Sequence, residues 1–213
     1  MNIRDLKQKL DTKEQLIGRE RYKITGVLLP IFMLNDECHL MFNIRSQNIP
    51  QPGEVCFPGG KFDPKLDETT KDTALRETTE ELGIDSDKID YIGSLGHYIA
   101  PMGVLVDAYV AKLNIDSFDD LEFNRNEVEQ VFALPINQLK ENPPELYNVS
   151  IHVDPYHRKN GKKELLLPFE KLGIPKRYDK PWGNIKHRVF VYENDPVIWG
   201  ITAELLHEFL KIV

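Results

Sequence analysis

The sequence predicts a single α+β domain, in which a mixed β-sheet packs between helices. Apolar, β-rich segments come early in the chain, an acidic amphipathic helix follows at 67–82, and a second apolar helix closes the chain at 197–210. The length of 213 residues and the apolar fraction of 41% suit one large domain with a substantial core. We find no repeat, low-complexity tract or linker, so the prediction is one domain over 1–213, with a mixed sheet as its central layer.

The first elements are an N-terminal helix and a pair of strands. Residues 3–17 place apolar side chains among charged ones at helical spacing, which predicts a helical extension within 1–20 that ends near Gly18. Residues 24–34 are apolar and β-rich, and residues 38–44 read as a returning strand.

A loop and a glycine turn lead into the acidic helix. Residues 47–53 carry two prolines, and residues 55–57 form a short strand that ends at Pro58-Gly59-Gly60. Gly83 is a suitable residue to end the helix at 67–82. The stripe expected to face the core is Ala74, Leu75, Thr78 and Leu82.

The second half has weaker signals. We predict strands at 89–98, 103–113, 147–153 and 163–168, a short helix at 136–140 and a loop at 172–184. In the final helix the inner residues are expected to be Ile198, Ile201, Leu205 and Leu206.

Composition excludes several classes of protein. The net charge of −7 argues against a general nucleic-acid binder, and no apolar run reaches membrane-spanning length. The charged N-terminus is not a secretory signal, and Cys38 and Cys56 do not form a disulfide framework, so we expect a cytoplasmic protein. An acidic protein that handles an anionic substrate would need a metal ion or a local basic patch.

The most informative segment is the acidic helix. Glu77, Glu80 and Glu81 stand at i, i+3 and i+4, and therefore share one helix face. Carboxylates in this arrangement repel one another unless a cation lies between them, and oxygen ligands select Mg²⁺ or Mn²⁺. The alternative is a solvated, charged helix face; the upstream glycines and Glu68 favour the metal site.

Arg76 stands four residues before Glu80, within pairing distance on a helix. Its guanidinium can orient a carboxylate without titrating. The alternative is a surface ion pair worth at most about 1 kcal/mol.

This segment resembles the Nudix box, which reads Gly, five residues, Glu, seven residues, then Arg-Glu-U-x-Glu-Glu-x-Gly-U, where U is apolar. Here Glu68 is followed by seven residues and then by Arg-Glu-Thr-Thr-Glu-Glu-Leu-Gly-Ile at 76–84. Two departures stand out: seven residues separate Gly60 from Glu68, and Thr78 fills an apolar position. The resemblance places a box at 60–83, and it implies an α/β/α sandwich that hydrolyses a nucleoside diphosphate linked to another moiety.

Carried over by position, the resemblance implies roles for particular residues. Glu77 and Glu81 would be the principal metal ligands, with Glu80 contributing and Gly60 offering its carbonyl. The general base would be either Glu80 or Glu127, which resembles the acidic position that many Nudix enzymes carry beyond the box; the sequence leaves both open.

Segments at 40–46, 52–61 and 198–203 resemble the coenzyme A pyrophosphatase subfamily, although the loop at 49–52 lacks its usual basic residue and histidine. Arg45 could contact a phosphate and Lys61 could steer anions, with ordinary surface charges as the alternative. Trp199 could stack on adenine, although buried packing is the preferred interpretation.

The leading hypothesis is therefore a Mg²⁺- or Mn²⁺-dependent pyrophosphatase that cleaves coenzyme A or its thioesters into 3′,5′-ADP and 4′-phosphopantetheine. The alternatives are a Nudix hydrolase for NADH, ADP-ribose or another nucleotide, and a non-catalytic nucleotide sensor. The expected partner is a coenzyme A-like small molecule, not nucleic acid or a membrane. The amphipathic N-terminal segment leaves a homodimer open.

Overall fold

A computed structural model describes residues 16–118 and 121–213. The helix predicted at 3–17 falls almost entirely outside the described residues. The first half of the chain forms η1 (Arg19–Arg21), β1 (Lys23–Leu34), β2 (Glu37–Arg45), β3 (Val55–Cys56), β4 (Gly59–Lys61), α2 (Thr70–Leu82), η2 (Ser86–Lys88), β5 (Ile89–Ala100) and β6 (Val104–Leu113). The second half forms β7 (Val128–Pro135), α3 (Ile136–Glu141), β8 (Glu145–Val153), β9 (Tyr156–Lys159), β10 (Lys162–Leu165), η4 (Lys176–Asp179), β11 (Trp182–Tyr192), β12 (Ile198–Trp199) and α4 (Gly200–Leu210).

The central layer is a mixed seven-stranded sheet in the order β3-β2-β1-β6-β5, with β4 also paired to β1 and β7 to β2. β1 and β6 are parallel, and the other pairs are antiparallel. Because successive strand residues face opposite sides, Leu28 packs towards α2 while Leu29 packs towards α4.

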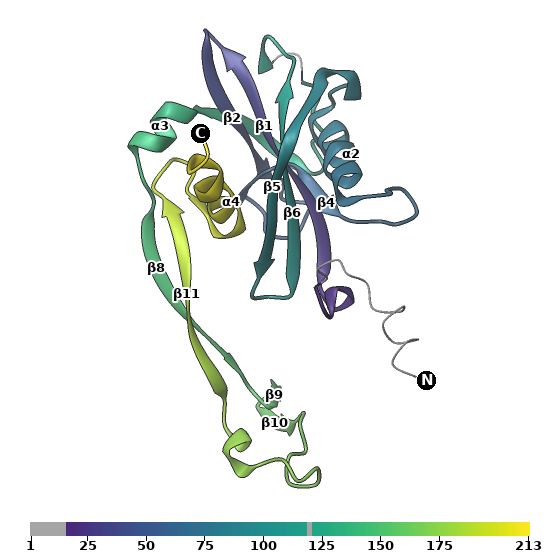
Figure 1. The fold of residues 1–213 in the computed structure, drawn as a ribbon, viewed down its shortest axis with the longest axis vertical. Coiled ribbons are helices and arrows are strands. Elements are labelled where there is room, and N and C mark those ends of the chain that lie inside the picture. Colours follow the sequence, from purple (N-terminus) through teal and green to yellow (C-terminus); the bar gives the residue numbers. More distant parts are fainter. Residues whose placement is uncertain (1–15, 119–120) are drawn as a thin grey trace, which may run out of the picture.

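Helices α2 and α4 cover opposite faces of this sheet (Figure 1). On the α4 side the core joins Phe42, Val106 and Leu206, and on the α2 side Met41 packs with Leu82. The predicted sandwich with a mixed sheet is confirmed.

Local signals set both ends of α2. Thr69 is extended and its hydroxyl accepts the N–H of Asp72, whose carboxylate accepts the Thr69 N–H in return. This capping box starts the helix at Thr70, so the predicted start at residue 67 is three residues early. Gly83 ends the helix with a φ of 62°, as predicted.

Thr78, which departs from the apolar position of the box, is fully buried. Its hydroxyl donates to the Ala74 carbonyl at 2.7 Å, so the polar atom is satisfied inside the helix. The substitution therefore fits the core.

The second half differs most from the prediction. β8 and β11 form a long two-stranded ribbon that extends away from the sandwich, with β9 and β10 beyond its far end (Figure 1). The segment predicted as a loop at 172–184 contains η4 and the first residues of β11, and β7 and β11 were not predicted as strands.

The final helix begins at Gly200, because Ile198 and Trp199 pair with β11 instead of entering the helix. Trp199 is half-exposed at 49%, so the expectation of buried packing for this side chain is wrong. Among the described residues, none of the helices is long and apolar enough to cross a bilayer.

Candidate active site

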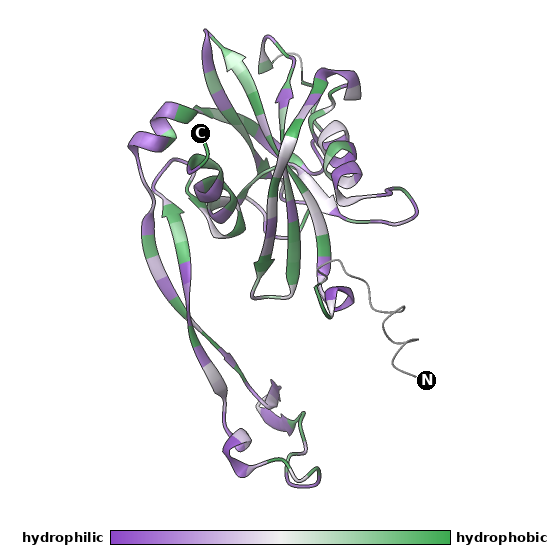
Figure 2. Ribbon diagram, in the orientation of Figure 1, coloured by the Kyte–Doolittle hydropathy of each residue, from purple (hydrophilic) through white to green (hydrophobic). Residues whose placement is uncertain are grey.

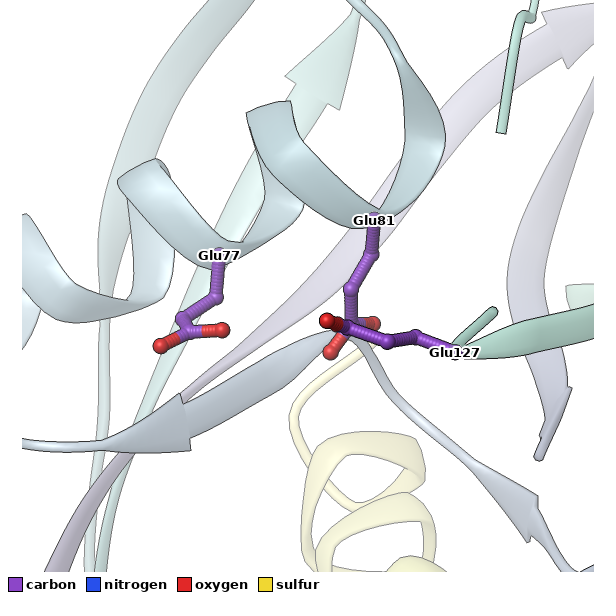
Figure 3. Close-up of side chains that lie close together, drawn as sticks. All are labelled: Glu77, Glu81 and Glu127. Atoms are coloured by element: carbon purple, nitrogen blue, oxygen red, sulfur yellow. The ribbon is translucent and has the colours of Figure 1, made fainter. Parts of the chain in front are cut away.

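Three carboxylates converge beside the carboxyl end of α2. Glu77 and Glu81 come from the helix, and Glu127 reaches in from the loop before β7 (Figure 3). One oxygen from each side chain lies within 4.8 Å of the others. The helix thus supplies two carboxylates one turn apart, and a distant loop supplies the third.

Glu81 is the most buried of the three. It accepts the Asn43 amide N–H at 2.8 Å and the backbone N–H of Gly59. Burial raises its pKa to about 8, helped by the charges of Glu77 and Glu127 and opposed by these two hydrogen bonds. The site therefore holds negative charge in a place where charge is unfavourable.

Glu77 lies against the glycine turn. A Cβ on Gly60 would fall 2.3 Å from the Glu77 carboxyl carbon, so only glycine lets β4 pass this close to α2. Burial raises the pKa of Glu77, the neighbouring Arg76 opposes this rise, and the charges of Glu80 and Glu127 add to it.

Arg76 contacts three carboxylates of the site through one guanidinium. It contacts both oxygens of Asp67 at 2.9 and 3.0 Å, Glu77 at 3.0 Å and Glu80 at 3.1 Å. The buried partner is thus Asp67, whereas Glu68, the acidic position that matches the box, is exposed. The carboxylate that holds Arg76 is therefore Asp67, the residue directly before Glu68.

Glu80 is placed differently from the other helix carboxylates. Its side chain is 54% exposed and paired with Arg76, and it is not part of the three-carboxylate cluster. Its predicted contribution as a ligand or base stays a prediction.

The loop that carries Glu127 is tied to the rest of the site by short polar contacts. The N–H of Ser46 donates to the Glu127 carbonyl and its hydroxyl donates to the Asn126 carbonyl. The N–H of Asn124 donates to the carbonyl of Glu81 at 2.9 Å. The loop is therefore anchored both to the end of β2 and to the end of α2.

The family model described as the NUDIX domain matches residues 26–155. This chain belongs to the Nudix family. The match covers β1 through β8 and therefore includes the glycine turn, α2 and the Glu127 loop.

Three curated relatives are similar to this Nudix chain over half of its length or more. Mouse "Peroxisomal coenzyme A diphosphatase NUDT7" is 37% identical over 113 residues, which are 53% of this chain and 47% of that protein. Nudix hydrolase 3 of Caenorhabditis elegans is 36% identical over 196 residues, 88% of this chain and 72% of that protein. Human "Mitochondrial coenzyme A diphosphatase NUDT8" is 35% identical over 123 residues, 57% of this chain and 52% of that protein.

The alignments thus span about half the length of the mouse and human relatives. Their names place those two proteins in peroxisomes and mitochondria, and the cytoplasmic location expected for this Nudix chain stays a prediction.

The two residues predicted to bind substrate lie at the ends of two strands, Arg45 at the end of β2 and Lys61 at the end of β4. Arg45 ends β2; its Nε donates to the Pro50 carbonyl at 2.9 Å, and its guanidinium contacts the Cys56 thiol. Lys61 is exposed at the end of β4. Desolvation and the nearby Glu81 carboxylate raise the pKa of Cys56 to about 12, so this thiol is not a nucleophile.

Sequence reasoning missed three residues that position the carboxylates: Asn43, Asp67 and Ser46. Asn43 interrupts the apolar run from Leu40 to Ile44, and that interruption was an available signal. Asp67 precedes the expected glutamate directly and could have been weighed as its rival. Ser46 was noted only as part of a resemblance, and its role depends on a loop 80 residues away.

Proposed function

We propose that this chain is a divalent-metal-dependent Nudix pyrophosphatase whose substrate is coenzyme A or one of its thioesters. The observation that carries the reaction class is the convergence of Glu77, Glu81 and Glu127 beside the Gly59-Gly60 turn. The substrate class is supported by the sequence around Arg45 and the glycine turn, and by the coenzyme A diphosphatases among the relatives. The products would be 3′,5′-ADP and 4′-phosphopantetheine, or its acylated form.

The residues present suit a hard divalent cation. All three side chains that converge here are carboxylates, and Mg²⁺ and Mn²⁺ prefer oxygen. The Oδ1 of Asn43 is buried and has no hydrogen-bond partner among the described residues, while its amide nitrogen holds Glu81. Burial, together with repulsion between neighbouring carboxylates, raises the pKa values of Glu77 and Glu81, and a bound cation would offset both effects.

When bound, such an ion neutralises pyrophosphate oxygens, lowers the pKa of water and stabilises the leaving phosphate. The protein's own part is to hold the ligands. Gly59 and Asn43 fix the Glu81 carboxylate, and Arg76 fixes Glu77.

Hydrolysis joins a water oxygen to one phosphorus, breaks the bridging P–O bond and releases a proton that the protein must accept. Glu127 is favoured over Glu80 as the acceptor, because the Glu127 carboxylate faces the cluster. Glu80 is exposed and its carboxylate is occupied by Arg76.

A substrate panel tests the assignment. The protein is incubated with Mg²⁺ or Mn²⁺ and with coenzyme A, NADH, ADP-ribose and diadenosine polyphosphates, and the products are separated by chromatography. Cleavage of NADH or ADP-ribose with coenzyme A untouched would refute the substrate class. No cleavage at all, with nucleotide binding retained, would favour the sensor. Incorporation of ¹⁸O from water into one product identifies the phosphorus attacked.

The metal assignment is tested by Glu81→Gln, which keeps the shape of the side chain and removes its charge. We expect turnover to fall at least about 100-fold and Mn²⁺ affinity, measured by calorimetry, to fall as well. The matched control is Glu122→Gln, which removes one exposed carboxylate outside the cluster. Turnover and Mn²⁺ binding by Glu81→Gln that match this control would rule out the proposed ligand.

A further inference from the structure

The β8–β11 ribbon has two faces of opposite character. In an antiparallel pair, directly opposed residues point to the same side. The register therefore puts Tyr147 beside Val189, Val149 beside His187 and Ile151 beside Ile185 on one face. Continuing past a bulge, Val153 pairs with Trp182. We call Tyr147, Val149, Ile151, Val153, Ile185 and Val189 the apolar ribbon face.

The opposite face is polar over the same length. Its opposed pairs are Ser150 with Lys186 and Asn148 with Arg188. Along β8, polar and apolar residues alternate from Asn148 to Val153, as its purple and green bands show (Figure 2). β11 instead carries Lys186, His187 and Arg188 in succession and then apolar residues from Val189 to Val191.

The polar face is the one turned towards the sandwich. Phe190 belongs to it, and its ring stacks on His207 of α4 with centroids 4.0 Å apart. The apolar ribbon face consequently points away from α4. Within the described part of the chain, Tyr147, Val149, Val153 and Ile185 are between 48% and 63% exposed, and Ile151 and Val189 are partly buried.

A two-stranded ribbon with one solvent-exposed apolar face is only marginally stable in water by itself. Stable ribbons normally pack such a face against another layer. Each buried aliphatic side chain contributes roughly 1.5–3 kcal/mol, so covering the face would stabilise the ribbon considerably. The sandwich core does not supply this cover.

We propose that a second copy of this chain covers the apolar ribbon face, with the two faces packed against each other around a two-fold axis. Opposed sheet faces stack about 10 Å apart with their side chains interdigitated. A two-fold contact needs a self-complementary patch, and the pairs from 147 to 151 contain no Lys, Arg, Asp or Glu, only His187 and the Tyr147 hydroxyl as polar groups. The first carboxylate on this side is Glu145, opposite Val191.

The charge distribution permits the same arrangement, although the two ribbons carry the same net charge. Residues 145–192 hold ten Lys and Arg but only five Asp and Glu, within a chain of net charge −7. Lys186 and Arg188 lie on the polar face, so they stay hydrated when the apolar faces meet. An acidic partner attracted by these Lys and Arg side chains would bind the polar face and would leave the apolar ribbon face exposed to solvent.

The area is adequate for a specific dimer. The half-exposed apolar side chains offer on the order of 400–500 Å² per copy, and ribbon backbone and flanking polar atoms bring the contact towards the ~800 Å² per partner of a standard interface. The face also continues through Val191 to Trp199, which line a cavity of about 500 Å³ with Pro52 and Glu54. A second copy would therefore reach close to the cavity beside β3.

Sedimentation equilibrium of the full-length protein tests the proposal. We expect a dimer with a dissociation constant of about 1–100 µM. Ile185→Glu places a carboxylate on the apolar ribbon face, and because it occurs twice in a two-fold contact it should weaken the dimer at least about 100-fold. Ser150→Glu adds the same charge on the polar face and should leave the dimer unchanged. Both positions are accessible to solvent, so neither variant disturbs a core, and thermal unfolding verifies this.

Two further measurements separate this arrangement from its rivals. Like-charged ribbons repel, so added salt should tighten the dimer by screening. Hydrogen exchange at the β8 amides should slow as protein concentration rises. A monomeric wild type, a dimer that survives Ile185→Glu, or one that weakens with salt would each overturn the proposal. If the protein is a monomer, slow hydrogen exchange of the β8 amides that requires a long-chain acyl thioester would identify a ligand as the cover of the apolar ribbon face. Slow exchange in the monomer without any addition would point to residues 1–15.

Discussion

The contact between Asp67 and Arg76 yields the most quantitative prediction. Asp67→Asn keeps the size of the side chain but replaces one acceptor oxygen with an amide donor that faces the guanidinium. Asp67 accepts both the Nε and a terminal nitrogen of Arg76 at 2.9 and 3.0 Å, and the Thr73 hydroxyl at 2.8 Å. The substitution therefore breaks a bidentate pair and sets two donors against each other.

The pKa of Asp67 gives the magnitude. Hydrogen bonds from Arg76, opposed by burial, lower this pKa from 3.8 to about 2, which corresponds to about 2 kcal/mol of stability at neutral pH. Removing one partner of a fully buried pair costs about 3–5 kcal/mol, but Arg76 remains 23% exposed and water replaces part of the loss. We expect Asp67→Asn to lower the free energy of unfolding by about 2 kcal/mol and the melting temperature by about 4–8 °C.

The sign of the pH dependence follows from the same pKa. The folded protein holds the Asp67 carboxylate ionised down to a lower pH than the unfolded chain does. The stabilisation is therefore complete above about pH 4 and disappears as the pH falls towards 2. Wild type and Asp67→Asn should differ most at neutral pH and converge in acid.

Urea unfolding at several pH values measures this difference, with Glu68→Gln as the control on the neighbouring, exposed carboxylate. That control should stay within about 0.5 kcal/mol of wild type. Unchanged stability of Asp67→Asn together with destabilisation of Glu68→Gln would refute the pairing of Asp67 with Arg76 and would identify Glu68 as the partner.

Two other substitutions test how the carboxylates are positioned. Gly60→Ala brings a methyl group within 2.3 Å of the Glu77 carboxyl carbon, so Mn²⁺ affinity should fall about 10-fold or more in a calorimetric titration; unchanged affinity would contradict the close approach of β4 and α2. Ser46→Ala removes the hydroxyl that holds the Asn126 carbonyl, so the loop that carries Glu127 is held less firmly and turnover should fall several-fold. The free energy of unfolding should fall by only about 1 kcal/mol. A loss of stability without any loss of turnover would assign Ser46 a purely structural part.

The parts of the molecule predicted correctly are those whose signals are local. The end of α2 was predicted correctly from Gly83, which lies directly after the helix, whereas its start was predicted three residues early. Likewise β1 and β2 form a hairpin around Asn35 and Asp36, both of which have positive φ. Such elements can be predicted from a short window of sequence because their stabilising contacts lie in that window.

The parts that were missed depend on partners far along the chain. β11 is a strand because it pairs with residues of β8 that lie 29 to 46 positions earlier, and β7 because it pairs with β2. Asn43 meets Glu81 at a separation of 38 residues. Register at that range is set by the folded sheet, and no local pattern determines it.

Two features of this chain raise the free energy of the folded state unless a further component binds to them. Glu77, Glu81 and Glu127 concentrate negative charge in a partly buried place, and the pKa of Glu81 at about 8 reflects that cost. The apolar ribbon face leaves large side chains in water, at a comparable cost in free energy. Both arrangements become favourable on adding one component: a divalent cation between the carboxylates and a second copy against the ribbon. Because either component binds only the folded chain, each should raise the melting temperature in a concentration-dependent way, and the two increments should be separable by Glu81→Gln and Ile185→Glu.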